Sequence, residues 1–198
     1  MSGIISDNTG RGTGLIKAAA GGNLIKLGAT TVSSSTAYID LTTVFSSTYK
    51  YYKLFANDIE FNTSTYMEVS FLVGGTVQTG TYNGKHVAII GTDSTSSGQD
   101  DDQSATSGFR PIGGWVHSTG QDVNCSMELT FFDPNNNGTY NIMTWSANVR
   151  QSSGSNTAIY MFGQGHYAAS IAATGVRVAA TSGNTLEAGT FSLYGIKE

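Results

Sequence analysis

The most chemically suggestive stretch of the sequence is an acidic segment near its middle. Asp93 is followed by the run Asp100, Asp101 and Asp102, and carboxylate oxygens are ligands that calcium prefers. The run lacks the alternating spacing and the terminal glutamate of an EF-hand loop. Segment 92–107 also has no large apolar side chain, so it is too polar to pack. An acidic exposed loop is the favoured interpretation, with the four aspartates as candidate ligand residues for calcium or for a binding partner.

The histidines and the cysteine do not form a metal site. His86, His117 and His166 are isolated from one another, and neither Cys-x-x-Cys nor His-Glu-x-x-His spacing occurs. The single cysteine, Cys125, alternates onto the same strand face as Met127, which predicts a buried thiol rather than a nucleophile. We expect no catalytic residues, no metal and no cofactor.

A short glycine motif matches part of a dinucleotide-binding fingerprint. Gly163-Gln164-Gly165 has the first spacing of that motif, and Glu187 lies roughly where its acidic partner is expected. The segment 169–174 that follows is too short, and too soon interrupted by Gly175, to be the helix that holds the phosphates. A strand followed by a glycine loop is the preferred interpretation.

Glycoside hydrolysis is the remaining catalytic chemistry, and it needs two carboxyl groups facing one substrate. The glutamates on predicted strands or at their ends are Glu60, Glu68, Glu128 and Glu187. Alternation places Glu68 and Glu128 on the polar faces of their strands, where ordinary solvent-facing glutamates also lie. Nothing in the spacing makes two of them converge, so we expect a protein that is not an enzyme.

The elements that position these residues are β-strands. Apolar and polar residues alternate with a period of two in segments 67–73 and 125–131, which gives each strand one buried and one exposed face. Further strands are predicted at 37–45, 49–61, 86–90, 115–116, 140–149, 158–162, 175–179 and 190–196. No segment has the pattern of a long helix.

Two turn signals support hairpins between these strands. Asn83-Gly84 predicts a type I′ turn, and the segment 133–138 separates two alternating strands. Many short antiparallel strands predict an all-β fold, an antiparallel β-sandwich of jelly-roll-like type. The apolar content of 39% is enough for one substantial core.

The charge of the chain excludes several classes of partner. Only 12% of the residues are charged, against ~25% in a typical domain, and the net charge is −4 with a pI near 5.2. A nucleic-acid-binding surface needs clustered Lys and Arg, so no nucleic acid is expected. No apolar run reaches the ~20 residues of a membrane span, and the start does not resemble a secretory signal. We expect no membrane insertion and synthesis in a cytoplasm.

The first part of the chain differs in composition from the rest. Residues 1–35 contain small apolar pairs between glycine-rich stretches, and glycine at this density disfavours a helix. We expect an extended N-terminal arm over 1–35 and a β-sandwich domain over 36–198. The candidate assembly anchors in this arm are Ile4, Ile5, Leu15 and Ile16, with Arg11 available for a carboxylate. An arm folded back along its own domain is an equally weighted alternative.

The two ends of the sequence carry a family resemblance. Segment 3–17 (GIISDNTGRGTGLIK) and segment 189–197 (GTFSLYGIK) resemble the ends of small virion structural proteins of tailed bacteriophages, especially phages of marine bacteria and cyanobacteria. The likeness extends over most of the chain but is specific only at the termini. These motifs are structural, so the resemblance implies a location in a particle rather than an activity.

The resemblance implies a virion component, made in the host cytoplasm, that is either a tail-fibre-associated protein or a capsid decoration protein. The expected partners are other virion proteins and further copies of the chain, with a homotrimer as the first choice. Two alternatives remain open. One is a receptor-binding module that recognises a host-surface glycan or protein through loops such as 92–107, and the other is a glycan-degrading enzyme.

Overall fold

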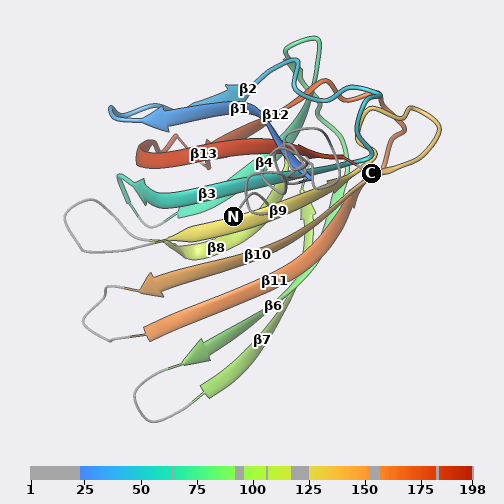
Figure 1. Ribbon diagram of the computed structural model, residues 1–198. Coiled ribbons are helices and arrows are strands. Elements are labelled where there is room, and N and C mark those ends of the chain that lie inside the picture. Colours follow the sequence, from blue (N-terminus) through green and yellow to red (C-terminus); the bar gives the residue numbers. More distant parts are fainter. Residues whose placement is uncertain are drawn as a thin grey trace, which may run out of the picture.

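The computed structural model describes residues 23–63, 65–91, 96–105, 107–116, 125–151, 157–181 and 183–197. These residues form thirteen β-strands and no helix, and all of their strand pairs are antiparallel (Figure 1). The prediction of an all-β antiparallel protein is confirmed. None of the described segments is a helix long and apolar enough to cross a membrane.

The larger of two sheets has eight strands in the order β1-β13-β3-β9-β10-β11-β6-β7. Their bounds are β1 (Leu24–Val32), β13 (Leu186–Ile196), β3 (Tyr51–Phe61), β9 (Ser126–Phe132), β10 (Asn141–Gln151), β11 (Thr157–Tyr167), β6 (Tyr82–Gly91) and β7 (Ser96–Ala105). We call it the large sheet. In Figure 1 it fans out from β1 to β7 as a twisted layer, the twist expected of a long antiparallel sheet.

The smaller sheet has five strands and covers one face of the large one. Strands β2, β12 and β4 are neighbours in that order, and β5 and β8 both pair with β4. The bounds are β2 (Tyr38–Leu41), β12 (Gly175–Ala180), β4 (Thr65–Val73), β5 (Thr76–Val77) and β8 (Phe109–Val116). We call it the small sheet.

The core lies between the two sheets and is rich in aromatic side chains. Phe71 from the small sheet packs against Phe131 from the large sheet, with ring centroids 6.0 Å apart. Tyr82 and Tyr167 of the large sheet also contact Phe71, at 6.4 and 6.3 Å. Edge and tilted ring contacts of this kind add to simple area burial. The alternation predicted for 125–131 is confirmed, because Cys125, Met127, Leu129 and Phe131 are all buried. In 67–73 it holds at Met67, Val69 and Phe71, but Ser70 and Leu72, predicted to face outward, are buried as well.

The predicted type I′ hairpin at Asn83-Gly84 is wrong. Both residues lie inside β6, paired with His166 and Gly165 of β11. A side chain at Gly84 would come within 3.1 Å of the Trp145 indole, so this glycine makes room for a core side chain rather than for a turn. The hairpin of this kind is at Gly74-Gly75, between β4 and β5, where φ is +57° and +83°. Both central residues of a type I′ turn need positive φ.

The turn predicted at 133–138 is confirmed. Asp133 has a φ of +45°, and the Asn136 amide N–H donates to its carbonyl oxygen at 3.0 Å. The Asn136 side chain donates to the Asp133 carboxylate at 2.9 Å, and Lys50 donates to the same oxygen at 3.1 Å. Asparagine and aspartate tolerate such turn geometry because their side chains hydrogen-bond locally.

Two segments differ from the predicted domain plan. Residues 24–32, assigned above to the N-terminal arm, form β1 and pair with β13 along the edge of the large sheet. The chain therefore enters the fold before residue 36. Segment 92–107 was expected to be a loop too polar to pack, but residues 96–105 form β7, which pairs with β6 over its whole length. Backbone pairing alone can hold a polar edge strand, and charged residues there discourage pairing with other chains.

Candidate functional site

The outer face of the large sheet carries a row of large apolar side chains. The strand register aligns Leu24 of β1, Ile196 of β13, Tyr51 of β3, Phe132 of β9 and Ile142 of β10 side by side. Each alternates with core residues, so each points away from the small sheet. Leu24, Tyr51 and Ile142 are 42%, 39% and 45% exposed. We call these five residues the apolar row.

A second apolar group lies on the same face at the other side of the sheet. Tyr160 of β11 pairs with Ile89 of β6, and Phe162 pairs with Val87. The Tyr160 and Phe162 rings are 5.9 Å apart, and Tyr160, Phe162 and Ile89 are each more than 40% exposed. We call these four residues the β6–β11 block. Cross-strand pairs stabilise a sheet, but Tyr160, Phe162 and Ile89 still leave more than two fifths of their own surface in water.

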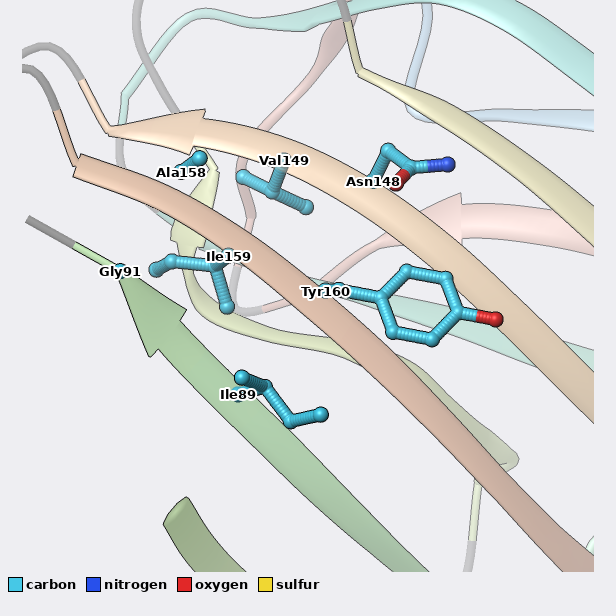
Figure 2. A pocket seen from close by; sticks show the side chains of 7 residues that line it. All are labelled: Ile89, Gly91, Asn148, Val149, Ala158, Ile159 and Tyr160. Carbon is cyan, nitrogen blue, oxygen red and sulfur yellow. The ribbon is translucent and has the colours of Figure 1, made fainter. Parts of the chain in front are cut away.

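A shallow hollow of about 410 Å³ opens beside the β6–β11 block (Figure 2). It is lined from three neighbouring strands, by Ile89, Gly91, Asn148, Val149, Ala158, Ile159 and Tyr160. The lining is apolar apart from the Asn148 amide and the Tyr160 phenol. It can accept an apolar group and one hydrogen bond, but it contains no carboxylate, imidazole or thiol for acid-base or nucleophilic chemistry.

Polar side chains separate the two apolar groups. Lys53 forms an ion pair with Glu128 between them, and the Lys53 ammonium lies 6.0 Å from the Phe55 ring. At the end of the apolar row, the Tyr140 ring stacks on His166 with centroids 5.7 Å apart. Tyr140 is itself 55% exposed. The outer face of the large sheet therefore combines exposed aromatic side chains with few charges, as in the centre of a protein interface.

The outer face of the small sheet has a different chemistry. Arg177 of β12 donates through Nε and Nη2 to the two carboxylate oxygens of Asp40, both at 2.7 Å, and its guanidinium lies 3.6 Å from the Tyr38 ring centroid. Hydrogen bonding to Asp40 raises the pKa of Arg177 above its ordinary value, which keeps it charged. We call Tyr38, Asp40 and Arg177 the β2 triad.

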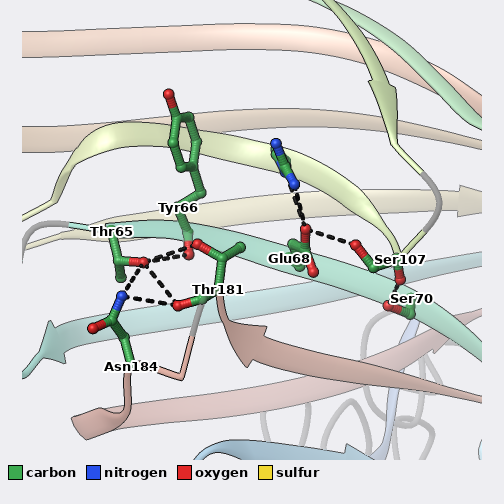
Figure 3. A network of polar contacts seen from close by, with 8 residues as sticks. Thr65, Tyr66, Glu68, Ser70, Ser107, Thr181 and Asn184 are labelled. Carbon is green, nitrogen blue, oxygen red and sulfur yellow. Dashed lines mark hydrogen bonds and ion pairs between the residues drawn. The ribbon is translucent and has the colours of Figure 1, made fainter.

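A second triad on this sheet repeats the first. Arg110 of β8 donates through Nε and Nη2 to Glu68 Oε1 at 3.0 and 2.9 Å, and it lies over the Tyr66 ring at 5.3 Å. The Ser107 hydroxyl donates to the same oxygen at 2.8 Å (Figure 3). We call Tyr66, Glu68 and Arg110 the β4 triad.

A buried hydroxyl network supports the start of β4 beneath Tyr66. The Thr65 and Thr181 hydroxyls are 2.9 Å apart, and the Asn184 side chain donates to Thr65 Oγ1 at 3.0 Å and to the Thr181 carbonyl at 2.8 Å (Figure 3). The Thr181 amide N–H donates to the Tyr66 carbonyl at 3.1 Å. These contacts fix the backbone that carries Tyr66.

The buried titratable groups of the described residues include Cys125 and Tyr82. Cys125 is fully buried, as predicted, and burial raises the pKa of its thiol to about 12. Burial also raises the pKa of the Tyr82 phenol, whose hydroxyl donates to the Gln78 carbonyl at 2.8 Å. Within the described ranges, no three His, Cys, Asp or Glu side chains come together as a metal site would require.

Two of the glutamates considered for glycoside hydrolysis, Glu68 and Glu128, do not face one substrate, whereas Glu60 pairs with Ala188, next to Glu187 in β13. Glu68 lies on the outer face of the small sheet and Glu128 on the outer face of the large sheet, so the core separates them. Both are ion-paired, with Arg110 and Lys53 respectively. Hydrogen bonds from Thr185 and Ser35 lower the pKa of Glu187, which keeps it ionised.

The other predicted site residues are only partly described. The candidate anchors Ile4, Ile5, Arg11, Leu15 and Ile16 lie outside the described residues, as does Asp93. Asp100, Asp101 and Asp102 lie in strand β7, where their backbones pair with Val87, His86 and Lys85. The expected ligand loop is thus an edge strand over these three positions.

Comparisons with known proteins do not assign the chain to a family. No family model and no curated protein matches the chain. A crystal structure of a structural-genomics protein of unknown function from Bacteroides ovatus is 14% identical over 49% of this chain and 44% of that one, with a TM-score of 0.28. The chain thus spans less than half of that protein. An aerolysin-like protein from Bombina maxima is 11% identical over 85% of this chain and 91% of that one, with a TM-score of 0.08.

Sequence reasoning missed both triads and the β6–β11 block. A signal for the triads is present, because Tyr38-Ile39-Asp40 and Tyr66-Met67-Glu68 share the pattern Tyr-x-acid within alternating strands. Their arginines come from 137 and 42 residues away in the sequence, and only the strand register brings them together.

Proposed function

We propose that this protein is a non-enzymatic assembly component, a structural protein of a tailed-phage virion. It docks on the particle through its N-terminal arm and through the outer face of the large sheet, and it displays the rest of the β-sandwich outward. The jelly-roll class and the homotrimer belong to this proposal. The sequence resemblance at the termini supports the virion location, and the exposed apolar side chains on one sheet face support the assembly role.

The observation that carries the proposal is the distribution of exposed apolar side chains. Among the residues whose exposure the structure describes, which in β8 are residues 109–112, nine large hydrophobic residues are well exposed, and two of them, Tyr38 and Tyr66, belong to the small sheet. The others are Leu24, Tyr51, Ile89, Tyr140, Ile142, Tyr160 and Phe162. Exposed apolar groups gathered on one face in this way favour an interaction site.

The size of this face fits a stable interface. Strands β3, β9, β10, β11 and β6 lie ~4.8 Å apart. Their lengths range from seven residues in β9 to eleven in β3, and an average of about ten residues at ~3.4 Å gives a face of roughly 24 by 34 Å. That is roughly 800 Å², similar to the ~800 Å² that each partner buries in a standard protein complex. The same face can therefore support contact with a second copy or with another particle protein.

Particle rebinding tests the proposal. The full chain, a shortened chain that begins at Asn23, and the double variant Tyr160→Ser with Phe162→Ser are each mixed with purified particles that lack this protein. Light scattering measures the mass of each form, with three times the chain mass of 20.8 kDa expected for the full chain. Tyr38→Ser, which removes an exposed ring from the opposite sheet, is the matched control.

We expect the full chain and the control to sediment with the particles, and the shortened chain and the double variant to stay in solution. The shortened chain begins at residue 23 rather than 36 because β1 is part of the large sheet. If neither the full chain nor the control rebinds, or if the double variant rebinds as well as the full chain, the proposal is wrong.

A further inference from the structure

The two triads on the small sheet are built in the same way. In each, a tyrosine and an acid stand two positions apart on one strand, and an arginine from the neighbouring strand pairs with the acid and lies over the tyrosine ring. In both pairs the guanidinium contacts the acid through Nε and Nη2. Two side-on Arg–carboxylate pairs, each with an arginine over a ring, therefore stand on one face of the four strands β2, β12, β4 and β8.

Fold stability alone accounts poorly for this arrangement. The side chains of these ion pairs are largely shielded from solvent, so the cost of desolvating the charges offsets much of their attraction, and Tyr38 and Tyr66 remain 46% and 40% exposed. The contacts do fix the rings and the charged groups in place before any ligand arrives. A ring that is held by an arginine on one side offers its other side to a ligand at little cost in conformational entropy.

A small residue forms the floor between the two triads. Ala179 of β12 is paired with Tyr38 of β2 on one side and with Glu68 of β4 on the other. Two strand spacings put the backbones of Tyr38 and Glu68 about 9.6 Å apart, and Ala179 rises only one methyl group between them. A small residue at this position does not cover Tyr38, which stays 46% exposed.

We propose that the Ala179 floor and the two triads bind a neutral carbohydrate. The faces of Tyr38 and Tyr66 stack on the apolar C–H face of sugar rings, in the way aromatic side chains combine apolar contact with polar recognition. The arginines and carboxylates supply fixed donors and acceptors for hydroxyl groups. The three hydrogen bonds to Glu68 described above all use Oε1, and the Arg177–Asp40 contact leaves Nη1 directed away from Asp40.

The charge of the site selects a neutral ligand. Each guanidinium is already paired with a carboxylate, so the four charged groups cancel. An anionic sugar or a phosphate bound beside these arginines would lie close to the carboxylate of Asp40 or Glu68, and the two negative charges would repel each other. A hydroxylated, uncharged ligand can bond to both members of each pair without breaking it. The inference does not rest on the assembly role, since it uses the opposite outer face.

Glycan binding by the full chain tests the proposal. The probe is an array of neutral and anionic oligosaccharides, and each oligosaccharide that is retained is then titrated in solution. We expect retention of at least one neutral oligosaccharide, with affinity lowered about tenfold by Tyr38→Ala or Tyr66→Ala, the loss of one aromatic contact. Tyr38→Phe keeps the ring and retains binding, and Ala179→Gln fills the floor and abolishes it.

The matched controls lie on the large sheet. Tyr160→Ala and Ala158→Gln make the same changes at exposed positions of β11, and we expect them to leave glycan binding unchanged. Thermal unfolding of every variant checks that each is folded. The proposal is overturned if the full chain retains no neutral oligosaccharide, if it retains only anionic ones, or if the control variants weaken binding as much as the triad variants do. The chain is also tested for binding to host-cell envelopes before and after protease treatment, and before and after periodate oxidation of their glycans. If protease abolishes the binding and periodate does not, the ligand of this face is a protein, and the proposal is overturned.

Discussion

Gly163 of β11 is the position at which one added methyl group has the clearest structural consequence. It pairs with Trp145 of β10 on one side and with His86 of β6 on the other. A Cβ at this position would come within 2.5 Å of both the Lys85 carbonyl oxygen and Trp145 Cζ2. Neither neighbour can yield easily, because one is backbone of a central strand and the other is a buried indole. Gly163→Ala must therefore push β6 away from β11 or move Trp145.

The size of the effect follows from two opposing contributions. Ordinary contact begins near 3.4 Å, so relief of both clashes needs a shift of about 1 Å, and overpacking on this scale costs about 3 kcal/mol. Alanine also lowers the conformational entropy of the unfolded chain relative to glycine, which offsets ~0.4–1 kcal/mol of this destabilisation. We expect Gly163→Ala to lower the free energy of unfolding by about 2 kcal/mol. For a chain of this length that corresponds to a fall in Tm of about 6 °C.

Urea unfolding followed by far-ultraviolet circular dichroism measures this difference. Gly91→Ala is the matched control, because it lies on the adjacent strand β6 and its Cβ would meet only the Ala158 carbonyl oxygen at 3.7 Å. The control should be unchanged or slightly more stable. The reasoning is refuted if Gly163→Ala lies within about 0.5 kcal/mol of the wild type, the range of ordinary surface substitutions, or if Gly91→Ala loses as much stability.

Three further predictions concern the turn, the thiol and the edge strand. Desolvation raises the pKa of Asp133, but hydrogen bonds from Asn136 and Lys50 and the charge of Lys50 outweigh it and hold this pKa below its ordinary value. The Asp133 carboxylate therefore stabilises the fold above its unfolded pKa of ~3.9. This stabilisation is lost as the pH falls through the lower pKa of the folded state. The difference in free energy of unfolding between the wild type and Asp133→Asn is at most ~1 kcal/mol, and urea titrations should show it shrinking between about pH 6 and pH 3. A difference that stays constant over this range would contradict the prediction. Because Cys125 is buried with a pKa of about 12, Ellman's reagent at mildly alkaline pH should label the unfolded chain and leave the native chain unlabelled, and rapid native labelling would contradict this burial. Replacement of Asp100, Asp101 and Asp102 by threonine removes the charges of edge strand β7 and should increase aggregation in static light scattering, whereas unchanged scattering would show that these charges do not protect the edge.

The parts of the fold that could be predicted from sequence are those in which burial alternates along the chain. Strand β9 shows a period of two because one of its faces lies on the core, and β4 shows it over residues 65–69, before both faces become buried at residues 70–72. Strand β7 has no such pattern, since its sequence is polar throughout and its pairing with β6 is a backbone property. The Asn83-Gly84 pair led to a wrong hairpin prediction for a related reason. Glycine permits a turn, but at Gly84 its lack of a side chain serves the packing of Trp145.

The candidate surfaces were harder to predict from the sequence than the strands. Alternation predicts that Tyr160 and Phe162 lie on one face of a strand, but only the register shows that Ile89 and Val87 stand beside them. The triads likewise need the pairing of β12 with β2 and of β4 with β8. A local pattern therefore identifies half of each surface, and the partner strand supplies the other half through long-range contacts.

The two outer faces of a β-sandwich point in opposite directions, and here they carry different chemistry. The face with the apolar row and the β6–β11 block favours a protein contact that removes water, while the face with the triads keeps paired charges and half-exposed rings in water. A chain that docks through the large sheet must therefore present the triads away from the docking surface. The two proposals are separable for the same reason, because the core lies between the faces. Tyr160→Ser with Phe162→Ser should impair particle rebinding without changing glycan affinity, and Tyr38→Ala should do the reverse. A variant on either face that impairs both activities while remaining folded would show that the faces do not act independently.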